Sequence, residues 1–114
     1  MLQDASDCLE VRVTAAGREE ADRIRSAVVA QRLAADCQVI APIESTYWWA
    51  DEVRRSQEWL LLMKTTVERF EDLAWRVREL HSYEVPQIVA VALAVGTADY
   101  LDWIRRETAP RPGA

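Results

Sequence analysis

The chain has few of the residues that mark metal centres, disulfide scaffolds or nucleic-acid binding. Its 114 residues include two cysteines and one histidine, and Lys64 is the single lysine among 14 basic residues. Cys8 and Cys37 form no C-x-x-C pair, so neither a disulfide framework nor a zinc finger is indicated. In a reducing compartment we expect both to be free thiols. The net charge of −5 argues against a nucleic-acid partner.

Long hydrophobic runs are also missing. The longest, Ile88 to Val95, has eight residues, far fewer than the ~20 needed to cross a bilayer, so no membrane partner is expected. The first residues are acidic where a signal peptide needs basic ones, which favours a cytoplasmic protein. The length and the 50% apolar content are typical of one domain. We expect this domain over residues 1–108 and a flexible tail over 109–114.

Hydrophobic periodicity predicts alternating strands and helices. Apolar residues at every second position predict a strand over 9–14, and a stripe at spacings of three and four predicts a helix over 18–35. Pro42 indicates a sheet edge, a bend or a bulge. The other expected elements are extended segments over 37–49 and 52–65 joined by a turn at Ala50-Asp51, a helix that begins after Thr66 and ends at 81–84, a strand over 85–95 buried on both faces and ended by Gly96, and a helix over 98–107.

This order of elements, with the extra helix at the end, is that of the ferredoxin-like α+β fold, β-α-β-β-α-β. The paired segments 37–49 and 52–65 are long for such a small domain. Thirteen residues span ~43 Å at ~3.3 Å per residue, whereas the domain diameter is ~34 Å. Such a tryptophan-rich hairpin either enters a partner chain or bends over its own sheet. We expect the first, and therefore an oligomer with closed symmetry.

Several motifs resemble the CutA divalent-cation-tolerance family over about residues 9–107. They are Ser45-Thr46-Tyr47-Trp48-Trp49, Glu58 through Lys64-Thr65-Thr66, His81-Ser82-Tyr83-Glu84-Val85-Pro86 and Asp99-Tyr100-Leu101-Asp102-Trp103-Ile104, with Leu33-Ala34-Ala35 similar to the family's Leu-Ala-Ala-Cys. The resemblance implies a ferredoxin-like trimer whose long hairpins complete sheets across subunits, similar in architecture to the PII signalling proteins. It also implies a role in the response to divalent metal ions.

The copper ligands proposed for some family members are only partly present. The resemblance places Val13 at the position of a cysteine and Leu80-His81 at the position of two histidines. Asp36 stands where Leu-Ala-Ala-Cys has its cysteine, and Ser82 replaces the proline of His-Pro-Tyr. One imidazole supplies too few donors for a soft metal. No cofactor is therefore required, and a divalent cation, copper or another, would need His81 or carboxylates from several subunits.

Each candidate residue has a functional and a structural interpretation. His81 is a metal contact or a cap at the end of a helix. Lys64, before a helix N-terminus, is an anion contact or a side chain that extends to solvent. Glu58 and Glu84 are a carboxylate pair for a hard cation such as Ca²⁺ or Mg²⁺, or ordinary solvated charges. The aromatic candidates line a ligand cleft or pack in an interface: Tyr47, Trp48, Trp59, Tyr83 and Trp103.

The sequence predicts a binding protein rather than an enzyme, because it offers no convincing Ser-His-Asp or Cys-His arrangement. We expect a homotrimer with a role in the divalent metal response, weak ligand or metal binding between subunits, and a further protein partner of unknown identity. The alternative is a PII-like regulatory module that senses a small anion between subunits. The predicted ligand cleft comprises Tyr47, Trp48, Glu58, Lys64, Thr65, Tyr83, Glu84 and Trp103, with His81 as the metal residue.

Overall fold

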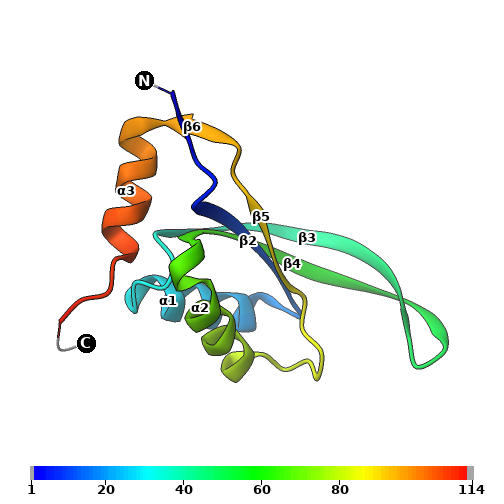
Figure 1. Ribbon diagram of the computed structural model, residues 1–114. Helices are drawn as coiled ribbons and strands as arrows, with labels where there is room; N and C mark the ends of the chain where they lie inside the picture. Colours follow the sequence, from blue (N-terminus) through cyan, green and yellow to red (C-terminus); the bar gives the residue numbers. More distant parts are fainter. Residues whose placement is uncertain (1, 113–114) are drawn as a thin grey trace.

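The computed structural model describes residues 2–112, which form three helices, a four-stranded sheet and a two-stranded sheet (Figure 1). The α+β class is therefore confirmed. The predicted tail begins one residue after the last helix ends, and its residues 113 and 114 lie outside the described range. The elements in chain order are β1 (Leu2–Asp4), β2 (Cys8–Ala15), α1 (Arg18–Ala30), β3 (Asp36–Trp49), β4 (Glu52–Thr66), α2 (Val67–Leu80), β5 (Ile88–Ala92), β6 (Val95–Thr97) and α3 (Ala98–Thr108).

The main sheet has the strand order β3-β4-β2-β5, and its neighbouring strands are antiparallel. Helices α1 and α2 both lie on one face of it, as right-handed crossovers require (Figure 1). The alternation in β2 explains this placement, because Val11 and Val13 are fully buried on the helix side, level with Met63 and Leu61 of β4. The apolar stripes of the two helices complete this core with Ala21, Ile24, Val28, Leu73 and Val77.

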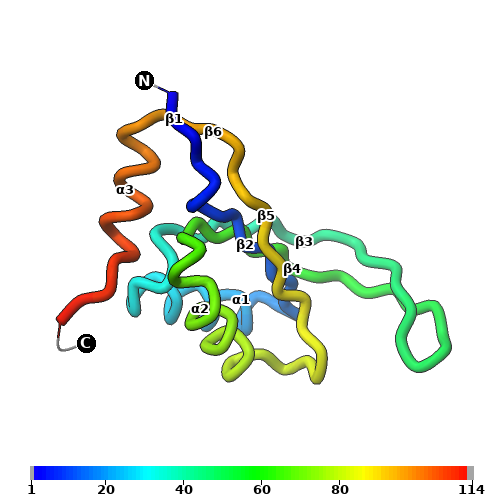
Figure 2. The backbone as a smooth tube through the Cα atoms, viewed as in Figure 1, coloured from blue at the N-terminus to red at the C-terminus, as the bar shows by residue number. Residues whose placement is uncertain are grey.

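The hairpin formed by β3 and β4 extends well beyond the helices (Figure 2). It makes the molecule elongated, with extents of 47 × 33 × 22 Å. Its turn lies at Ala50 and Asp51, as predicted, and both residues have positive φ, 53° and 62°. Such angles are those of the tight turns that match strand twist. Pro42 lies in an irregularity of the pairing between Ile40 and Ile43, on the edge strand β3, so the predicted edge and bulge are confirmed.

Two predicted elements were wrong in extent. Helix α1 ends at Ala30 rather than at residue 35, because Arg32 adopts a positive φ of 58° and the amides of Leu33 and Ala34 both donate to the Val28 carbonyl. The predicted strand over 85–95 is instead two strands in different sheets, and Gly96 lies inside β6 rather than ending a strand. The β5 part is also largely exposed, not buried on both faces, because it forms a sheet edge in the single chain.

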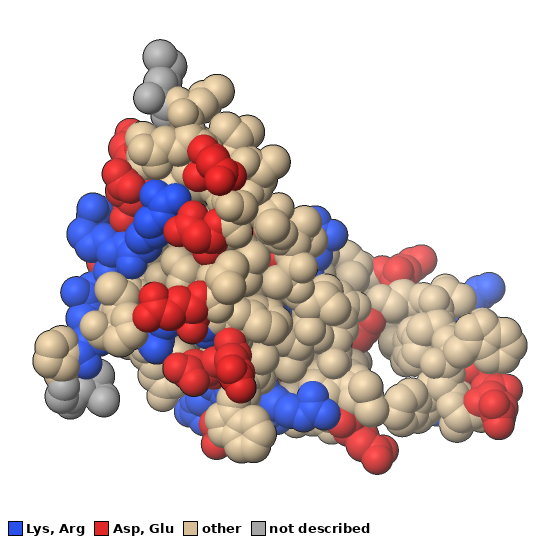
Figure 3. Space-filling view, viewed as in Figure 1, with Lys and Arg blue, Asp and Glu red and all other residues tan. Residues whose placement is uncertain are grey.

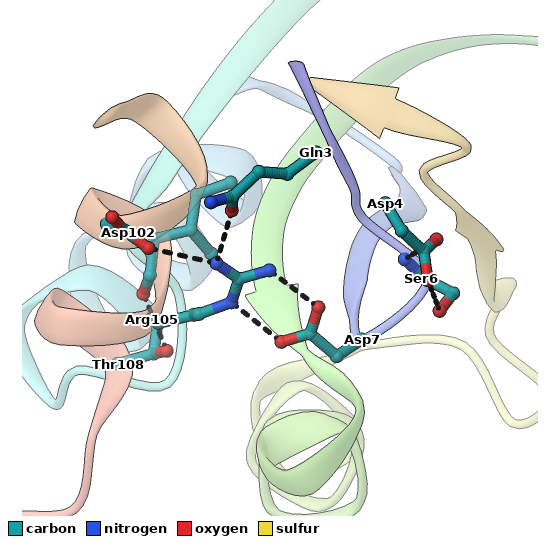
Figure 4. Close-up of polar contacts among 8 residues, drawn as sticks. Gln3, Asp4, Ser6, Asp7, Asp102, Arg105 and Thr108 are labelled. Atoms are coloured by element: carbon teal, nitrogen blue, oxygen red, sulfur yellow. Dashed lines mark hydrogen bonds and ion pairs between the residues drawn. The ribbon is translucent and has the colours of Figure 1, made fainter. Parts of the chain in front are cut away.

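Helix α3 packs at one end of the sheet over a small cluster that includes Cys8, Leu101 and Ile104. Figure 4 shows how Arg105 fastens it: the guanidinium donates two 2.8 Å bonds to the Asp7 carboxylate and a third, of 3.0 Å, to Asp102. The hydrogen bonds from Arg105 hold the pKa of Asp7 below its usual value. The unpredicted ribbon of β1 and β6 lies beside this contact. Within the described range, no helix has the length and apolarity that crossing a membrane requires.

Candidate functional site: a cleft at the base of the hairpin

A cleft of about 720 Å³ lies where the hairpin leaves the body of the molecule. This volume is within the range of small-molecule sites. It contains five of the eight predicted cleft residues: Tyr47, Trp48, Glu58, Tyr83 and Glu84. The others in its lining are Thr14, Ser45, Thr46, Trp49, Arg54, Val85 and Gln87.

The register of the hairpin explains why these side chains meet. Tyr47 pairs with Arg54, and Ser45 pairs with Ser56, so their side chains share one face of the ribbon. Glu58 lies on the same face of β4, two residues further on. This face is the one turned away from α1 and α2, since Leu61 of β4 has the opposite parity and is buried under the helices. The segment after α2 closes the cleft with Tyr83 and its neighbours.

Glu58 is the most buried charged residue of the cleft, with 6% of its surface exposed. Its Oε2 accepts a 2.9 Å hydrogen bond from the Tyr83 hydroxyl. Burial, and then this hydrogen bond and the charge of Glu58, raise the pKa of Tyr83. Among residues 2–112, no ammonium or guanidinium group forms an ion pair with Glu58; Arg54 pairs with Glu52 instead, at 3.5 Å. The cleft therefore holds a buried carboxylate without a cationic partner.

His81 supports the cleft from behind and does not line it. Its side chain is fully buried, and its Nδ1 lies 3.1 Å from the Tyr83 amide nitrogen and its Nε2 2.6 Å from the Thr14 carbonyl oxygen. Because an amide can only donate and a carbonyl can only accept, Nδ1 accepts and Nε2 carries the proton. Both nitrogens are thus engaged. This favours the structural interpretation at the end of α2; a metal role for His81 stays a prediction.

Glu20 organises the same loop, a role that its favourable position in the first turn of α1 does not by itself indicate. It is buried, and its carboxylate accepts hydrogen bonds from the amides of Ala16 and Ser82 and from the Ser82 hydroxyl. Burial would raise the pKa of Glu20, but these hydrogen bonds outweigh it, so the pKa lies below its usual value. The network Glu20–Ser82–His81 fixes the backbone that presents Tyr83 to the cleft.

Lys64, Thr65 and Trp103 lie elsewhere. Lys64 contacts Gln38, with 3.2 Å between Nζ and Oε1, and Asp36, with 3.8 Å between Nζ and Oδ1. Thr65 is fully buried and donates its hydroxyl to the Leu33 carbonyl at 2.7 Å. The anion contact expected at the start of α2 therefore has its lysine already paired.

Trp103 lines a separate cavity of about 410 Å³ between α3 and the end of α1. An ion pair between Arg32 and Glu107, 3.1 Å long, lies beside it. Trp59 packs against the main core, and its buried Nε1 has no hydrogen-bond partner among the residues that the structure describes. Neither tryptophan belongs to the cleft at the hairpin base.

The donor set of the chain fits a tightly held metal poorly. Among residues 2–112, no three His, Cys, Asp or Glu side chains gather closely enough to hold an ion. Val13, at the family's cysteine position, is fully buried in the core and offers no donor. Glu58 and Glu84 line the same cleft. Their two carboxylates supply at most four oxygen atoms, fewer than the six to eight oxygen ligands that Ca²⁺ takes.

The surface around the cleft differs from the rest of the molecule. In Figure 3 acidic and basic side chains are interspersed over the body that contains the helices. The hairpin, which projects to the right in that view, presents mostly uncharged surface with a few acidic and basic atoms toward its tip. Its exposed aromatic residues include Trp48, of which 73% is accessible.

Comparison with known proteins relates the chain to one group. Residues 9–107 match the family described as CutA1 divalent ion tolerance protein. The chain is 45% identical over 98 residues to the divalent-cation tolerance protein CutA of Thermus thermophilus, covering 86% of this chain and 95% of that protein. It is 36% identical over 94 residues to the protein of that name from Archaeoglobus fulgidus, covering 82% and 91%. The solved Thermus thermophilus structure superimposes with a TM-score of 0.88 at 43% identity, covering 90% of this chain and 99% of that one.

Proposed function

Because the chain belongs to the CutA1 divalent ion tolerance family, we propose that it acts in divalent metal tolerance as a homotrimer that binds a ligand weakly in the cleft at the hairpin base. The observation that carries this proposal is the apolar sheet face that a single chain leaves uncovered. The proposed role is binding rather than catalysis.

The uncovered face is the side of the main sheet away from α1 and α2. Cross-strand pairs place Ile40 beside Leu60 and Arg12 beside both Leu62 and Val89, all on this side. Val89 and Val91 are 50% and 44% exposed, and Ile40 is 49% exposed. An antiparallel sheet can leave one face in water, but that face is then normally polar. The apolar side chains of this face flank the Arg12–Glu10 ion pair on both sides, and exposed apolar groups gathered in this way are typical of a protein interface.

The hairpin and the sheet edges support a closed ring of copies. The hairpin projects beyond its own helices with Trp48 and Val53 exposed, and β3 and β5 are both unpaired at their outer edges. An open, apolar sheet edge favours uncontrolled pairing with other chains unless something covers it. A ring in which each hairpin packs against the next copy covers edges and face together, and closure prevents continued growth.

Metal binding in this proposal depends on the assembly. One chain contributes two carboxylates to the cleft, so a divalent cation would be held weakly or by groups from more than one copy. Anion sensing is the less favoured alternative, because Lys64 is paired with Gln38 and Asp36. We also propose a cytoplasmic location, which suits the unpaired state of Cys8 and Cys37.

Sedimentation equilibrium tests the assembly. The wild-type protein is expected at three times the 13.0 kDa mass of one chain. Val91→Asp places a charge on the uncovered face and should reduce the mass to that of one chain. Val67→Asp is the matched control, because Val67 is also exposed but lies on α2; it should leave the mass unchanged. A wild-type protein that sediments as a single chain would overturn the proposal.

Calorimetry tests the metal part of the proposal. Titration of the purified protein with Cu²⁺, Zn²⁺ and Ca²⁺ should give weak binding by at least one ion, and Glu84→Gln should reduce it. Glu68→Gln, at an exposed position on α2 away from the cleft, should bind as the wild type does. If titration with none of the three ions releases or absorbs heat, the proposal of direct metal binding is wrong, and a role in metal tolerance would not involve binding of the metal by this protein.

A further inference from the structure

We propose that the cleft at the hairpin base takes a small organic cation, a quaternary or primary amine, as its ligand. This inference rests on the proposed function, because it names the ligand class of the same cleft. It is carried by two features of the cleft lining: the buried carboxylate of Glu58 and the rings of Tyr47, Trp49 and Tyr83.

The first feature is an uncompensated negative charge. Glu58 is 94% buried, yet its one hydrogen bond within residues 2–112 comes from the neutral hydroxyl of Tyr83. Buried charges in proteins are normally paired with an opposite charge, since removing an ion from water without a partner is costly. The Tyr83 hydroxyl occupies Oε2 and leaves Oε1 available. A cationic ligand supplies the missing charge.

The second feature is the aromatic lining. Trp49 lies two residues after Tyr47 on β3 and therefore on the same face of the ribbon, and Tyr47 is oriented by a 3.1 Å hydrogen bond from the Ser56 hydroxyl. Tyr83 is fixed from the other side of the cleft by its bond to Glu58. The faces of such rings attract ammonium groups, and several rings together are the usual way in which proteins bind quaternary amines.

Size and donor count favour an organic cation over a bare metal or an anion. A volume of about 720 Å³ suits a small organic molecule and is far larger than a metal ion needs. Aromatic carbon offers no ligand to Ca²⁺ or Mg²⁺, which require oxygen donors. Arg54 is the only basic residue among the described lining residues, and it is paired with Glu52. The carboxylates of Glu58 and Glu84 therefore keep the electrostatic potential in the cleft negative.

The test compares choline with 3,3-dimethyl-1-butanol, a neutral molecule of the same shape. Binding to the purified protein is followed by calorimetry and by tryptophan fluorescence. Choline should bind roughly tenfold or more tightly than the neutral isostere, the ratio expected of cation–π attraction plus charge pairing. Equal binding of the two molecules, or binding of neither, would overturn the inference.

Matched variants locate the site. Glu58→Gln keeps the shape and the Tyr83 hydrogen bond but removes the charge, so choline affinity should fall roughly tenfold while affinity for the isostere stays constant. Glu68→Gln removes an exposed charge elsewhere and should change neither affinity. Tyr47→Ala should weaken choline binding, whereas Trp75→Ala, which removes an exposed aromatic ring on α2, should not. Unchanged choline affinity in both Glu58→Gln and Tyr47→Ala would contradict the proposed site.

The outcome is separable from that of the proposed function. Sedimentation of each variant reports the assembly independently of any ligand. A trimer that does not bind choline would overturn the organic-cation inference and leave the trimer proposal intact. The same result is expected if a basic side chain of a neighbouring copy occupies the cleft. A single chain that binds choline and loses it in Glu58→Gln would support the cation site while overturning the trimer.

Discussion

Replacement of Glu20 by alanine should destabilise the protein although the residue touches no ligand. The variant removes an acceptor that serves the Ala16 amide, the Ser82 amide and the Ser82 hydroxyl. Hydrogen bonds to charged groups each contribute about 1.5–3 kcal/mol. Three bonds at the low end would contribute about 4.5 kcal/mol. Because Ala16 and Ser82 are exposed and regain water in the variant, we expect a smaller loss, about 3 kcal/mol in the free energy of unfolding at pH 7.

Urea unfolding at one fixed protein concentration measures this loss, since the stability of an oligomer depends on concentration. Glu19→Ala is the matched control, because Glu19 is exposed in the same helical turn and loses the same favourable interaction with the helix dipole. A difference between the two variants below about 0.5 kcal/mol would refute the role given to Glu20.

The same network has a defined pH dependence. The pKa of Glu20 lies below its ordinary value of 4.5 in the folded chain, so its contribution is complete above that value and is lost as the pH falls through the folded pKa. The stability gap between wild type and Glu20→Ala should therefore be constant near neutrality and shrink below pH 4.5. A gap that keeps its full size under strongly acidic conditions would contradict the hydrogen-bonding scheme.

Three further predictions concern the core, a cysteine of β3, and the ion pair that joins α3 to Asp7. Leu61→Ala, at a fully buried position, should lower the free energy of unfolding measured in urea by about 3 kcal/mol. Leu60 is half-buried in the single chain, so Leu60→Ala should lower this free energy by less. Burial raises the pKa of Cys37 to about 12, so iodoacetamide should alkylate it slowly at pH 8 when folded and quickly in urea; equal rates would contradict its burial. Arg105→Ala should accelerate hydrogen exchange in α3 and return the pKa of Asp7 toward 3.8, whereas unchanged exchange would show that the ion pair does not fasten the helix.

The sequence predicted best those elements whose pattern comes from burial within one chain. Strand β2 alternates because Val11 and Val13 face the helices, and α2 repeats because Leu73 and Val77 face the sheet. The end of α1 was missed because the turn uses Arg32 at positive φ, where glycine or asparagine is the usual signal.

The prediction for residues 85–95 shows where composition is ambiguous. An apolar run indicates burial, but it does not distinguish cover by the same chain from cover by another copy. Val89 and Val91 are half exposed here because β5 lies at a sheet edge with an uncovered face. The short strands β1 and β6 were not predicted, because each pairs over only three residues, which is too short to show an alternation of apolar and polar positions.

The cleft was predicted in part for a similar reason. Tyr47 and Glu58 belong to one hairpin, and its register places both on the same face. Lys64 was grouped with them by its motif, but it lies six residues further along β4, level with Asp36. The partners of His81 come from β2 and α1, and such long-range contacts leave no periodic trace in the sequence.

Native mass spectrometry of mixed isotopes tests the central claim most directly. Uniformly ¹⁵N-labelled and unlabelled chains would be unfolded together, refolded and sprayed from volatile buffer. A closed ring of three copies of this 13.0 kDa chain predicts four species, with zero, one, two or three labelled chains. Two peaks at the masses of the separate single chains would contradict the claim that the uncovered sheet face and the projecting hairpin are an interface between copies.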